Sequence, residues 1–240
     1  MSFSKGITKV RIMALVVAVI ILVASIGIWY MTQPQKPTRK NEITVRLHGP
    51  PDTLDPHLSS SVYSRQIYPN IFNALVRFDQ TTGEILPDLA ESWEVSKDGL
   101  QYTFNLYKNV AFHKGYGKFT AQDVKYSLGR VMDPATKAPR RPELASIDRI
   151  EVPDDYTVKI LLKKTDIAFL NRVAAYEHAY VVSEKAIREM GAEYGAHPIG
   201  TGPVVFESGD YRNTFALVAN KEYFKGSPKL GKVNFVVMTE

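Results

Sequence analysis

The side chains best suited to catalysis or metal binding in this sequence are its five histidines, His48, His57, His113, His178 and His197. No two of them lie three to five residues apart, and no HExxH pattern occurs, so a single helix cannot present two of them to one metal ion. The absence of cysteine removes thiolate metal ligands, disulfides and a thiol nucleophile. We therefore predict a structural or surface role for each histidine, and no metal or other cofactor.

Hydrolase and phosphate-binding patterns are also missing. No serine lies in a GxSxG elbow, and the triplet Ser59-Ser60-Ser61 has no evident base beside it. Gly115-Tyr-Gly117 and Gly200-Thr-Gly202 match neither GxxxxGK[ST] nor GxGxxG. The acidic pairs are predicted to be surface or capping groups, namely Asp88 with Glu91 and Asp154 with Asp155. The sequence thus predicts a protein that is not an enzyme.

The charge distribution excludes nucleic acid as a partner. The formal charge is +5, but three of the 30 basic residues (Lys5, Lys9 and Arg11) precede a long apolar run, and 27 basic residues remain against 25 acidic ones. Nucleic-acid binding needs basic side chains clustered on one face. The densest basic pairs, Arg140-Arg141 and Lys163-Lys164, are predicted to be solvated surface pairs.

The apolar run covers residues 12–31, which carry no charge. A helix of this length spans about 30 Å, the thickness of the hydrocarbon core of a bilayer. The basic residues before it favour a cytoplasmic segment at 1–11. We expect an uncleaved transmembrane anchor, a polar linker at 32–41 and an exported body. The alternative is a cleavable signal peptide whose shorter apolar region ends near Val23-Ala24-Ser25.

From Glu42 onward, strand and helix patterns alternate, which predicts a mixed α/β body. Strands are predicted at 43–47, 100–106, 156–162, 204–206, 214–218 and 233–238. Helices are predicted at 64–75, where Ile67, Ile71 and Leu75 share one face, after a capping box that begins at Thr120, and from Ser183 to Gly191. Because the last strand runs to the end of the sequence without a cap, we expect the chain to stop before its fold is complete.

Several motifs occur in a characteristic order. In chain order they are DTLDPH at 52–57, 73–75 with LPDLAESWEV at 86–95, 98–106 with 110–114, 119–124 with 126–130, and GTGP at 200–203 with 220–230. Each motif is weak alone, but their order and spacing over the whole exported body resemble one family. That family is the extracytoplasmic substrate-binding proteins of ABC importers for dipeptides, oligopeptides and nickel, known as solute-binding protein family 5.

The resemblance implies an α/β (mixed α+β) fold, a periplasmic-binding-protein-like clamshell that is incomplete in this chain. It implies a first lobe built from 42–75 and 176–240, with an extra small domain at 76–175. It also implies that the chain captures a peptide or other small solute and delivers it to ABC permease subunits. The body would then lie on the extracytoplasmic side of the cell membrane, held by the anchor at 12–31.

Ligand contacts are predicted in two stretches. After Asp55-Pro56 they are Ser59, Ser60 and Tyr63, and near the GTGP motif they are Thr201, Gly202, Tyr223 and Phe224. Clefts that bind backbone-rich ligands use hydroxyls and exposed main chain for hydrogen bonds and aromatic rings for apolar contact. The competing interpretation is structural: a helix approach, a turn and core aromatics.

Two other functions stay open. The chain could be a degenerate or repurposed membrane-tethered fragment of such a protein without a transport function, or an exported hydrolase with an unrecognised site. The sequence does not choose among dipeptides, longer peptides, oligosaccharides and nickel chelates as the ligand.

Overall fold

The computed structural model describes residues 22–25, 41–174 and 176–238. The chain divides into two units, residues 1–40 and residues 41–240, and of the first unit only the helical residues 22–25 are described. No helix within the described ranges has both the length and the apolar character needed to cross a bilayer. The predicted membrane span at 12–31 and linker at 32–41 lie outside the described residues, apart from 22–25 and Asn41.

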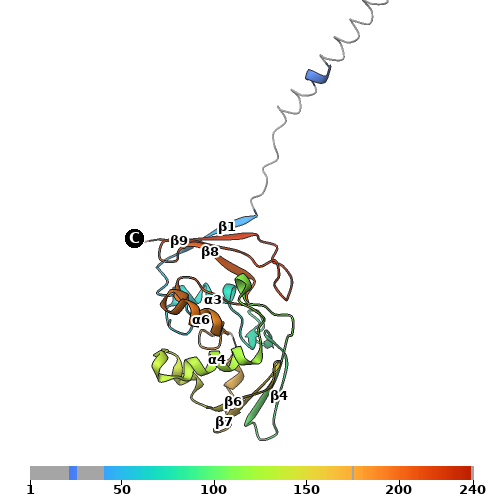
Figure 1. Cartoon of the computed structure of the whole chain (residues 1–240), viewed down its shortest axis with the longest axis vertical. Coiled ribbons are helices and arrows are strands. Elements are labelled where there is room, and N and C mark those ends of the chain that lie inside the picture. The colour runs from blue at the N-terminus through green and yellow to red at the C-terminus, as the bar shows by residue number, and fades with distance from the viewer. Residues whose placement is uncertain (1–21, 26–40, 175, 239–240) are drawn as a thin grey trace, which may run out of the picture. The chain divides into compact units, whose positions relative to one another are not determined.

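One end of the second unit is a four-stranded sheet in the order β1-β10-β9-β8 (Figure 1). Strand β1 (Glu42–Leu47) pairs in parallel with β10 (Lys232–Val237), and β9 (Thr214–Ala219) and β8 (Val204–Asp210) follow in antiparallel order. The rings of Phe215 and Phe235 stack with their centroids 4.8 Å apart. The strands predicted at 43–47, 204–206, 214–218 and 233–238 are thus confirmed as one sheet.

The opposite end is an antiparallel sheet in the order β4-β5-β7-β6. It contains β4 (Ala90–Val95), β5 (Gln101–Leu106), β7 (Thr157–Leu162) and β6 (Ile147–Asp154). A short hairpin of β2 (Val76–Phe78) and β3 (Ile85–Pro87) precedes it. Strands β5 and β7 match their predicted ranges because their apolar residues alternate; β2, β3, β4 and β6 lie where the pattern predicts no element.

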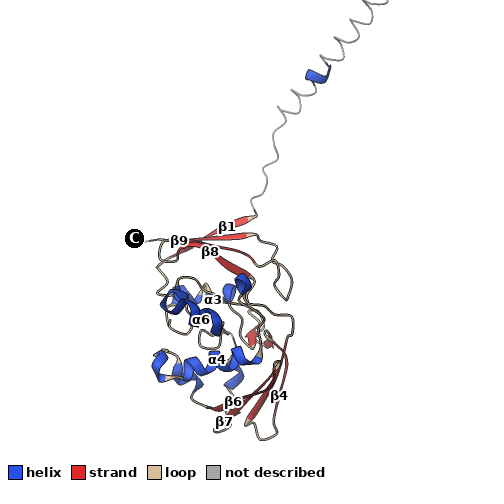
Figure 2. Cartoon of the chain, viewed as in Figure 1, coloured by secondary structure: helices blue, strands red, loops and turns tan. Residues whose placement is uncertain are grey.

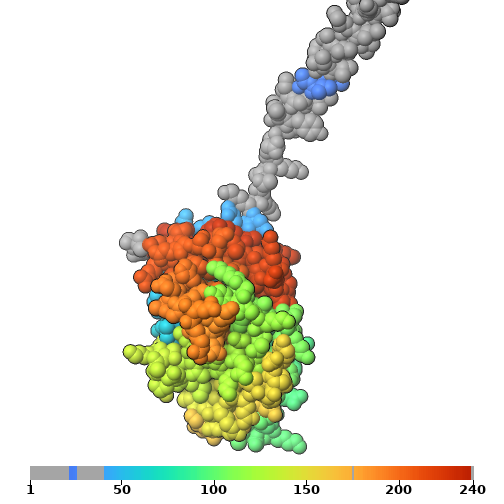
Figure 3. All heavy atoms as spheres, viewed as in Figure 1, coloured from blue at the N-terminus to red at the C-terminus, as the bar shows by residue number. Residues whose placement is uncertain are grey.

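Helices lie between the two four-stranded sheets (Figure 2). They are α2 (Val62–Arg65), α3 (Tyr68–Ile71), α4 (Ala121–Met132), α5 (Phe169–Arg172) and α6 (Glu184–Met190). Short 3-10 turns are η1 (His113–Gly115), η2 (Pro134–Thr136), η3 (Arg141–Leu144) and η4 (Gly191–Gly195). In the space-filling view, the segments after residue 200 cover one end of this unit, and those near residue 155 cover the other (Figure 3).

Two of the helices follow their predicted signals closely. The backbone N–H of Thr120 donates to the Asp123 carboxylate at 2.9 Å, which is the predicted capping box of α4, and Asp133 ends that helix. The Ser183 hydroxyl accepts from the N–H of Ala186 at 3.2 Å and caps α6, which ends at Gly191. Both caps satisfy N–H groups that have no partner inside their own helix.

The helix predicted at 64–75 is wrong as a single element. The chain forms α2, passes through Gln66 and Ile67, and starts again as α3 with a proline in the first turn. Proline lacks the N–H that would continue the ladder of α2, but it fits the start of a new helix. Ile67, Ile71 and Leu75 are still all buried, so the apolar spacing predicted burial correctly while the helix itself is broken.

A buried ion pair holds α4 against the loop that leads to α2. The Arg130 guanidinium donates to both carboxylate oxygens of Asp55, at 3.0 and 2.6 Å, and its Nη1 also lies 3.0 Å from Nδ1 of His57. Because a guanidinium can only donate, Nδ1 of His57 is the acceptor and Nε2 carries the proton. That Nε2 donates to the carbonyl of Tyr180 at 2.8 Å. Together with His57, the ion pair therefore links the loop after β1, helix α4 and the segment at 176–180.

We expect this histidine to make the protein less stable in acid. Burial lowers the pKa of His57 from 6.5 to about 4, so the unfolded chain binds a proton more readily between these values. The contribution of His57 is fully present above pH 6.5 and falls by about 3 kcal/mol as the pH drops towards 4. Chemical denaturation at pH 7.5 and pH 4.5 should show a smaller loss for His57→Gln than for the wild type. An unchanged pH dependence in His57→Gln would contradict the assignment.

The GTGP turn packs directly on the end of α3. A Cβ atom added to Gly200 would lie 2.0 Å from the carbonyl oxygen of Ile71, and the N–H of Gly202 donates to that same oxygen at 2.8 Å. His113 holds the turn from the other side, because its N–H donates to the Gly200 carbonyl at 2.9 Å and its Nε2 to the Gly202 carbonyl at 3.0 Å. Glycine is required at position 200 by this close approach of two backbones.

Two glycine substitutions should therefore act in opposite directions. Gly200→Ala should lower the free energy of unfolding by about 2 kcal/mol or more, because the backbone of α3 must shift. Gly129→Ala, on the exposed face of α4 with no atom within 4 Å of the added Cβ, should raise it by about 0.5–1 kcal/mol. Urea titrations of the two variants would measure both effects, and a stable Gly200→Ala protein would rule out the packing described above.

Candidate functional site

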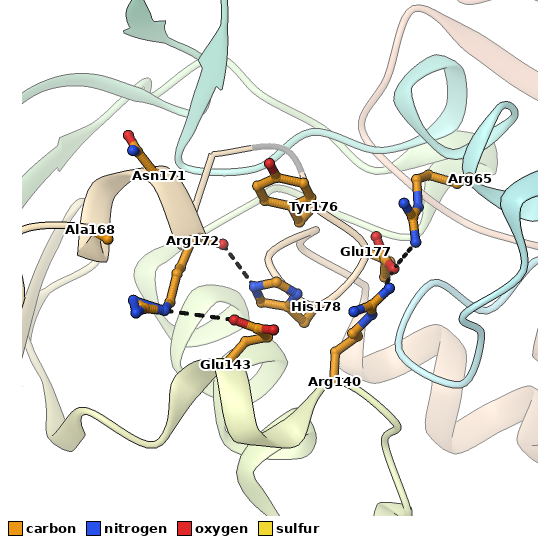
Figure 4. A pocket seen from close by; sticks show the side chains of 9 residues that line it. All are labelled: Arg65, Arg140, Glu143, Ala168, Asn171, Arg172, Tyr176, Glu177 and His178. Atoms are coloured by element: carbon orange, nitrogen blue, oxygen red, sulfur yellow. Dashed lines mark hydrogen bonds and ion pairs between the residues drawn. The ribbon is translucent and has the colours of Figure 1, made fainter.

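A polar pocket of about 340 Å³ opens between α2, η3, α5 and the segment at 176–178 (Figure 4). Its lining residues come from parts of the chain that are far apart in sequence. They are Arg65, Arg140, Glu143, Ala168, Asn171, Arg172, Tyr176, Glu177 and His178. The ion pair of Asp55 with Arg130 fixes two of these parts, because it anchors the loop before α2 and, through His57, the chain after Glu177.

The centre of the pocket wall is the carboxylate of Glu177, of which only 3% is exposed. One of its oxygens, Oε1, accepts from Nη2 of Arg65 at 2.9 Å and from Nε of Arg140 at 3.1 Å. Burying a carboxylate is costly unless it is paired, and here two guanidiniums share one oxygen. The second oxygen, Oε2, and Nε of Arg65 are buried and have no hydrogen-bond partner among the described residues.

His178 and Tyr176 form the next part of the wall. Their rings stack at 5.9 Å with an angle of 5° between the planes, and Tyr176 is 42% exposed. Nε2 of His178 bonds the carbonyl oxygen of Arg172 at 2.8 Å, so Nε2 carries the proton and Nδ1 presents a lone pair. Burial lowers the pKa of His178, which keeps the ring neutral. Nδ1 has no partner within the described part of the chain.

Arg172 differs from the other two arginines of the pocket because its charge is already balanced. Its Nη1 donates to both oxygens of Asp166 at 3.1 and 3.2 Å, and its Nε lies 3.6 Å from the Glu143 carboxylate. The described lining includes no serine, threonine or cysteine that His178 could activate as a nucleophile. The geometry therefore suits the binding of a polar solute.

A second, larger pocket of about 700 Å³ adjoins the first, since Arg65 and Tyr176 line both. Its wall contains Asp88, which is buried, and this corrects the prediction of a surface or capping group for that residue. Asp88 accepts from Nδ2 of Asn73, from the N–H of Ala74 at 3.0 Å and from Nζ of Lys225 at 2.7 Å. The other three acids of the predicted pairs, Glu91, Asp154 and Asp155, are exposed as expected.

Two of the four contacts predicted near the GTGP motif, Thr201 and Tyr223, bond Asn73. The Thr201 hydroxyl donates to Oδ1 of Asn73 at 3.0 Å, and Nδ2 of Asn73 donates to the Tyr223 hydroxyl at 3.2 Å. Tyr223 lines the larger pocket, whereas Thr201 and Gly202 are buried against α3 and Phe224 packs on Tyr107. A ligand contact for these four residues stays a prediction, and for Thr201 and Gly202 the contacts seen are structural.

The other predicted stretch lies on the approach to α2. The hydroxyl of Ser59 donates to Oδ1 of Asp52 at 2.6 Å and is buried, Ser60 is exposed, and the N–H of Tyr63 donates to the capping hydroxyl of Ser61. None of the three predicted residues lines either pocket. Tyr63 lies on α2 together with Arg65, and Ser59 and Ser60 lie in the loop before that helix. Their role in binding stays a prediction.

The residues that build the smaller pocket had no spacing signal in the sequence. Arg65 and Glu177 are separated by 112 residues and Arg140 and Glu177 by 37. Arg140 drew attention as half of a basic pair, but it is not a fully solvated surface residue, since it bonds a buried carboxylate. Among the described residues, no group of three or more His, Cys, Asp or Glu side chains could hold a metal ion.

Comparison with known proteins identifies the fold. The family described as bacterial extracellular solute-binding proteins, family 5 Middle, matches residues 84–240. The structure of MoaA from A. tumefaciens R10 in complex with mannopinic acid is similar with a TM-score of 0.80 and 34% sequence identity, over 84% of this chain and 41% of that one. The body therefore has the mixed α/β fold of periplasmic binding proteins.

Two curated relatives are similar in sequence. The glutathione-binding protein GsiB of Pectobacterium atrosepticum is 34% identical over 76% of this chain, and di/tripeptide-binding protein 2 of Pseudomonas aeruginosa is 33% identical over 78%. The aligned part spans 35% and 39% of the length of these relatives. This chain belongs to family 5 of the bacterial extracellular solute-binding proteins.

Proposed function

We propose that this chain captures peptide-type solutes for an ABC importer and does not catalyse a reaction. The observation that carries this proposal is the pocket at Glu177, where the partly exposed guanidiniums of Arg65 and Arg140 lie beside the exposed ring of Tyr176. A small-solute pocket uses a few placed polar groups for orientation and an apolar surface for contact, and this wall offers both. The lining gives such a ligand charge and directional bonds but no nucleophile.

The names of the relatives support a peptide-type ligand. GsiB is named for binding glutathione and its Pseudomonas relative for binding di- and tripeptides, whereas MoaA was solved with mannopinic acid. Pockets of roughly 300–1,000 Å³ typically bind small solutes and orient them with a few polar side chains in the pocket wall. The pocket at Glu177 and the larger one beside it form the surface on which we place the ligand.

The proposal includes the division of the body. Residues 42–75 and 176–240 form the first lobe of the clamshell, and residues 76–175 form the extra small domain. The sheet β1-β10-β9-β8 draws its strands from the first set, and the sheet β4-β5-β7-β6 draws its strands from the second. The ligand pocket then lies where side chains from both sets meet, since Arg65 and Glu177 belong to the lobe and Arg140 to the small domain.

We expect the full chain to be stabilised by its ligand. A solute that binds the folded state raises the unfolding free energy by about 2.7 kcal/mol at a hundred times its dissociation constant. Thermal unfolding should therefore shift upwards with at least one of three additions: glutathione, a mixture of di- and tripeptides, or mannopinic acid. Mass spectrometry should recover that solute unchanged, since turnover would favour the hydrolase alternative. No shift with any of the three would contradict the proposal.

Membrane attachment through residues 12–31 is the second part of the proposal, and its partners are the permease subunits of the importer. The support is the uncharged, apolar composition of that segment and the basic residues before it. After expression in a bacterial host, the chain should stay in the membrane pellet through alkaline carbonate washing. A variant that lacks residues 1–41 but carries its own cleavable signal should move to the soluble periplasmic fraction. Release of the full-length chain by carbonate would rule out an anchor.

A further inference from the structure

The two densest basic pairs of the sequence, at 140–141 and 163–164, come together beside the end of α4. One residue of each pair, Arg141 and Lys163, lines a pocket of about 240 Å³. The rest of its lining is apolar and consists of Met132, Pro142, Leu144, Ala145 and Ile147. None of these residues lines the pocket at Glu177. The two pockets are therefore separate.

Backbone carbonyls hold both cations of this pocket in place. Nε of Arg141 donates to the carbonyl oxygen of Met132, the last residue of α4, at 2.8 Å. Nζ of Lys163 donates to the carbonyl oxygen of Ala145 at 3.0 Å. Each contact uses one N–H of its cation. The terminal nitrogens of Arg141 and the other hydrogens of the Lys163 ammonium bond no described residue, so both cations keep donors for a ligand.

The positive charge of this pocket has no counter-charge among the described residues. Neither of its cations forms an ion pair there, and the acids nearest in sequence are engaged elsewhere. Glu143 lies 3.6 Å from Nε of Arg172, and Asp148 accepts from Arg149 at 3.0 Å. Asp133, directly after α4, accepts a backbone N–H as the cap of η2. The pocket thus offers two charges that a ligand can neutralise.

The lining also offers an apolar surface. Leu144 and Ile147 are buried, and Met132 is half-buried. Cations with unused N–H groups bind an oxyanion through charge-assisted hydrogen bonds, and apolar walls favour the removal of a carbon chain from water. A neutral solute leaves the two charges unused, and an inorganic anion leaves the apolar wall in contact with water. An oxyanion that carries a short aliphatic chain uses both.

We propose that this pocket is a second ligand site, which binds a carboxylate or phosphate group attached to a short aliphatic chain. Arg141 and Lys163 bind the oxyanion, and the side chain of Met132 with its apolar neighbours contacts the chain. The site lies apart from the pocket in which we place the transported solute. It therefore adds a second small-molecule ligand to the proposed function.

The test measures four probes on the full chain by titration calorimetry: hexanoate, hexyl phosphate, acetate and 1-hexanol. Hexanoate or hexyl phosphate should bind the wild type about 10-fold or more tightly than acetate, which lacks the chain, and than 1-hexanol, which lacks the charge. Loss of one charge-assisted contact weakens binding about 10- to 100-fold. We expect that loss for the anions in Lys163→Gln and, independently, in Arg141→Gln.

Lys164 provides the matched control. It is the next residue in the chain and is also exposed, but it does not line this pocket. Lys164→Gln removes the same formal charge from the same loop, so a general electrostatic attraction falls equally in Lys163→Gln and Lys164→Gln. Lys164→Gln should keep the wild-type affinity for the anions. Thermal unfolding of the lysine variants should coincide with that of the wild type, since both side chains are exposed.

Three results would overturn the second site. One is equal binding of the four probes by the wild type, and another is an equal loss in Lys163→Gln and Lys164→Gln. The third is competition between hexanoate and glutathione, which would place hexanoate in the pocket at Glu177. The proposed function fails separately, because its own solutes test a pocket that shares no lining residue with this one.

Discussion

The buried pair of Arg130 with Asp55 is the contact on which the position of the pocket depends. Taking both charges out of water is costly, and only a bidentate contact with further hydrogen bonds offsets that cost. Here the two N–H···O distances from Arg130 to Asp55 are 3.0 and 2.6 Å. Oδ1 of Asp55 also accepts from the backbone N–H of His57 at 3.0 Å. His57 then extends the network to the carbonyl of Tyr180. Removing one member leaves an uncompensated buried charge, so helix α4, the approach to α2 and the segment that carries Glu177 are fixed as one assembly.

Asp55, Asp88 and Glu177 are all buried acids, but they differ in how completely their carboxylate oxygens are hydrogen-bonded. Asp55 and Asp88 are buried and both of their carboxylate oxygens accept bonds from described residues. Glu177 is equally buried, but one of its oxygens has no partner among those residues. A buried polar atom without a partner costs free energy in the unliganded state. The hydroxyls of Ser146 and Tyr180 are also buried without a partner among the described residues, so an unpartnered buried atom does not by itself mark a binding residue.

Local signals in the sequence predicted much of the fold, since a capping box, an alternating strand or a turn glycine depends only on neighbouring residues. Helix α4 with its cap at Thr120 and strand β5 with Tyr102, Phe104 and Leu106 turned inwards are of this kind. The pocket was not predictable in the same way. Its centre needs Arg65, Arg140 and Glu177 to meet across 112 and 37 residues of chain, and none of these side chains belongs to a periodic pattern. Asp88 was misjudged for the same reason: its partner Lys225 lies 137 residues away.

The division of labour between these residues bears on how one fold can accept different solutes. The side chains that position the pocket, such as Asp55, His57 and Arg130, are buried and make their contacts to one another and to backbone. The side chains of Arg140 and Tyr176, which face the pocket, are partly exposed. Arg140 directly precedes the 3-10 turn η3, and Tyr176 lies in a loop. Surface loops tolerate substitution because few packed contacts depend on them. Changing Tyr176 should therefore alter the shape of the pocket at little cost in stability, whereas changing Arg140 removes a partner of the buried Glu177 carboxylate. In both cases the Asp55 network continues to hold the walls of the pocket.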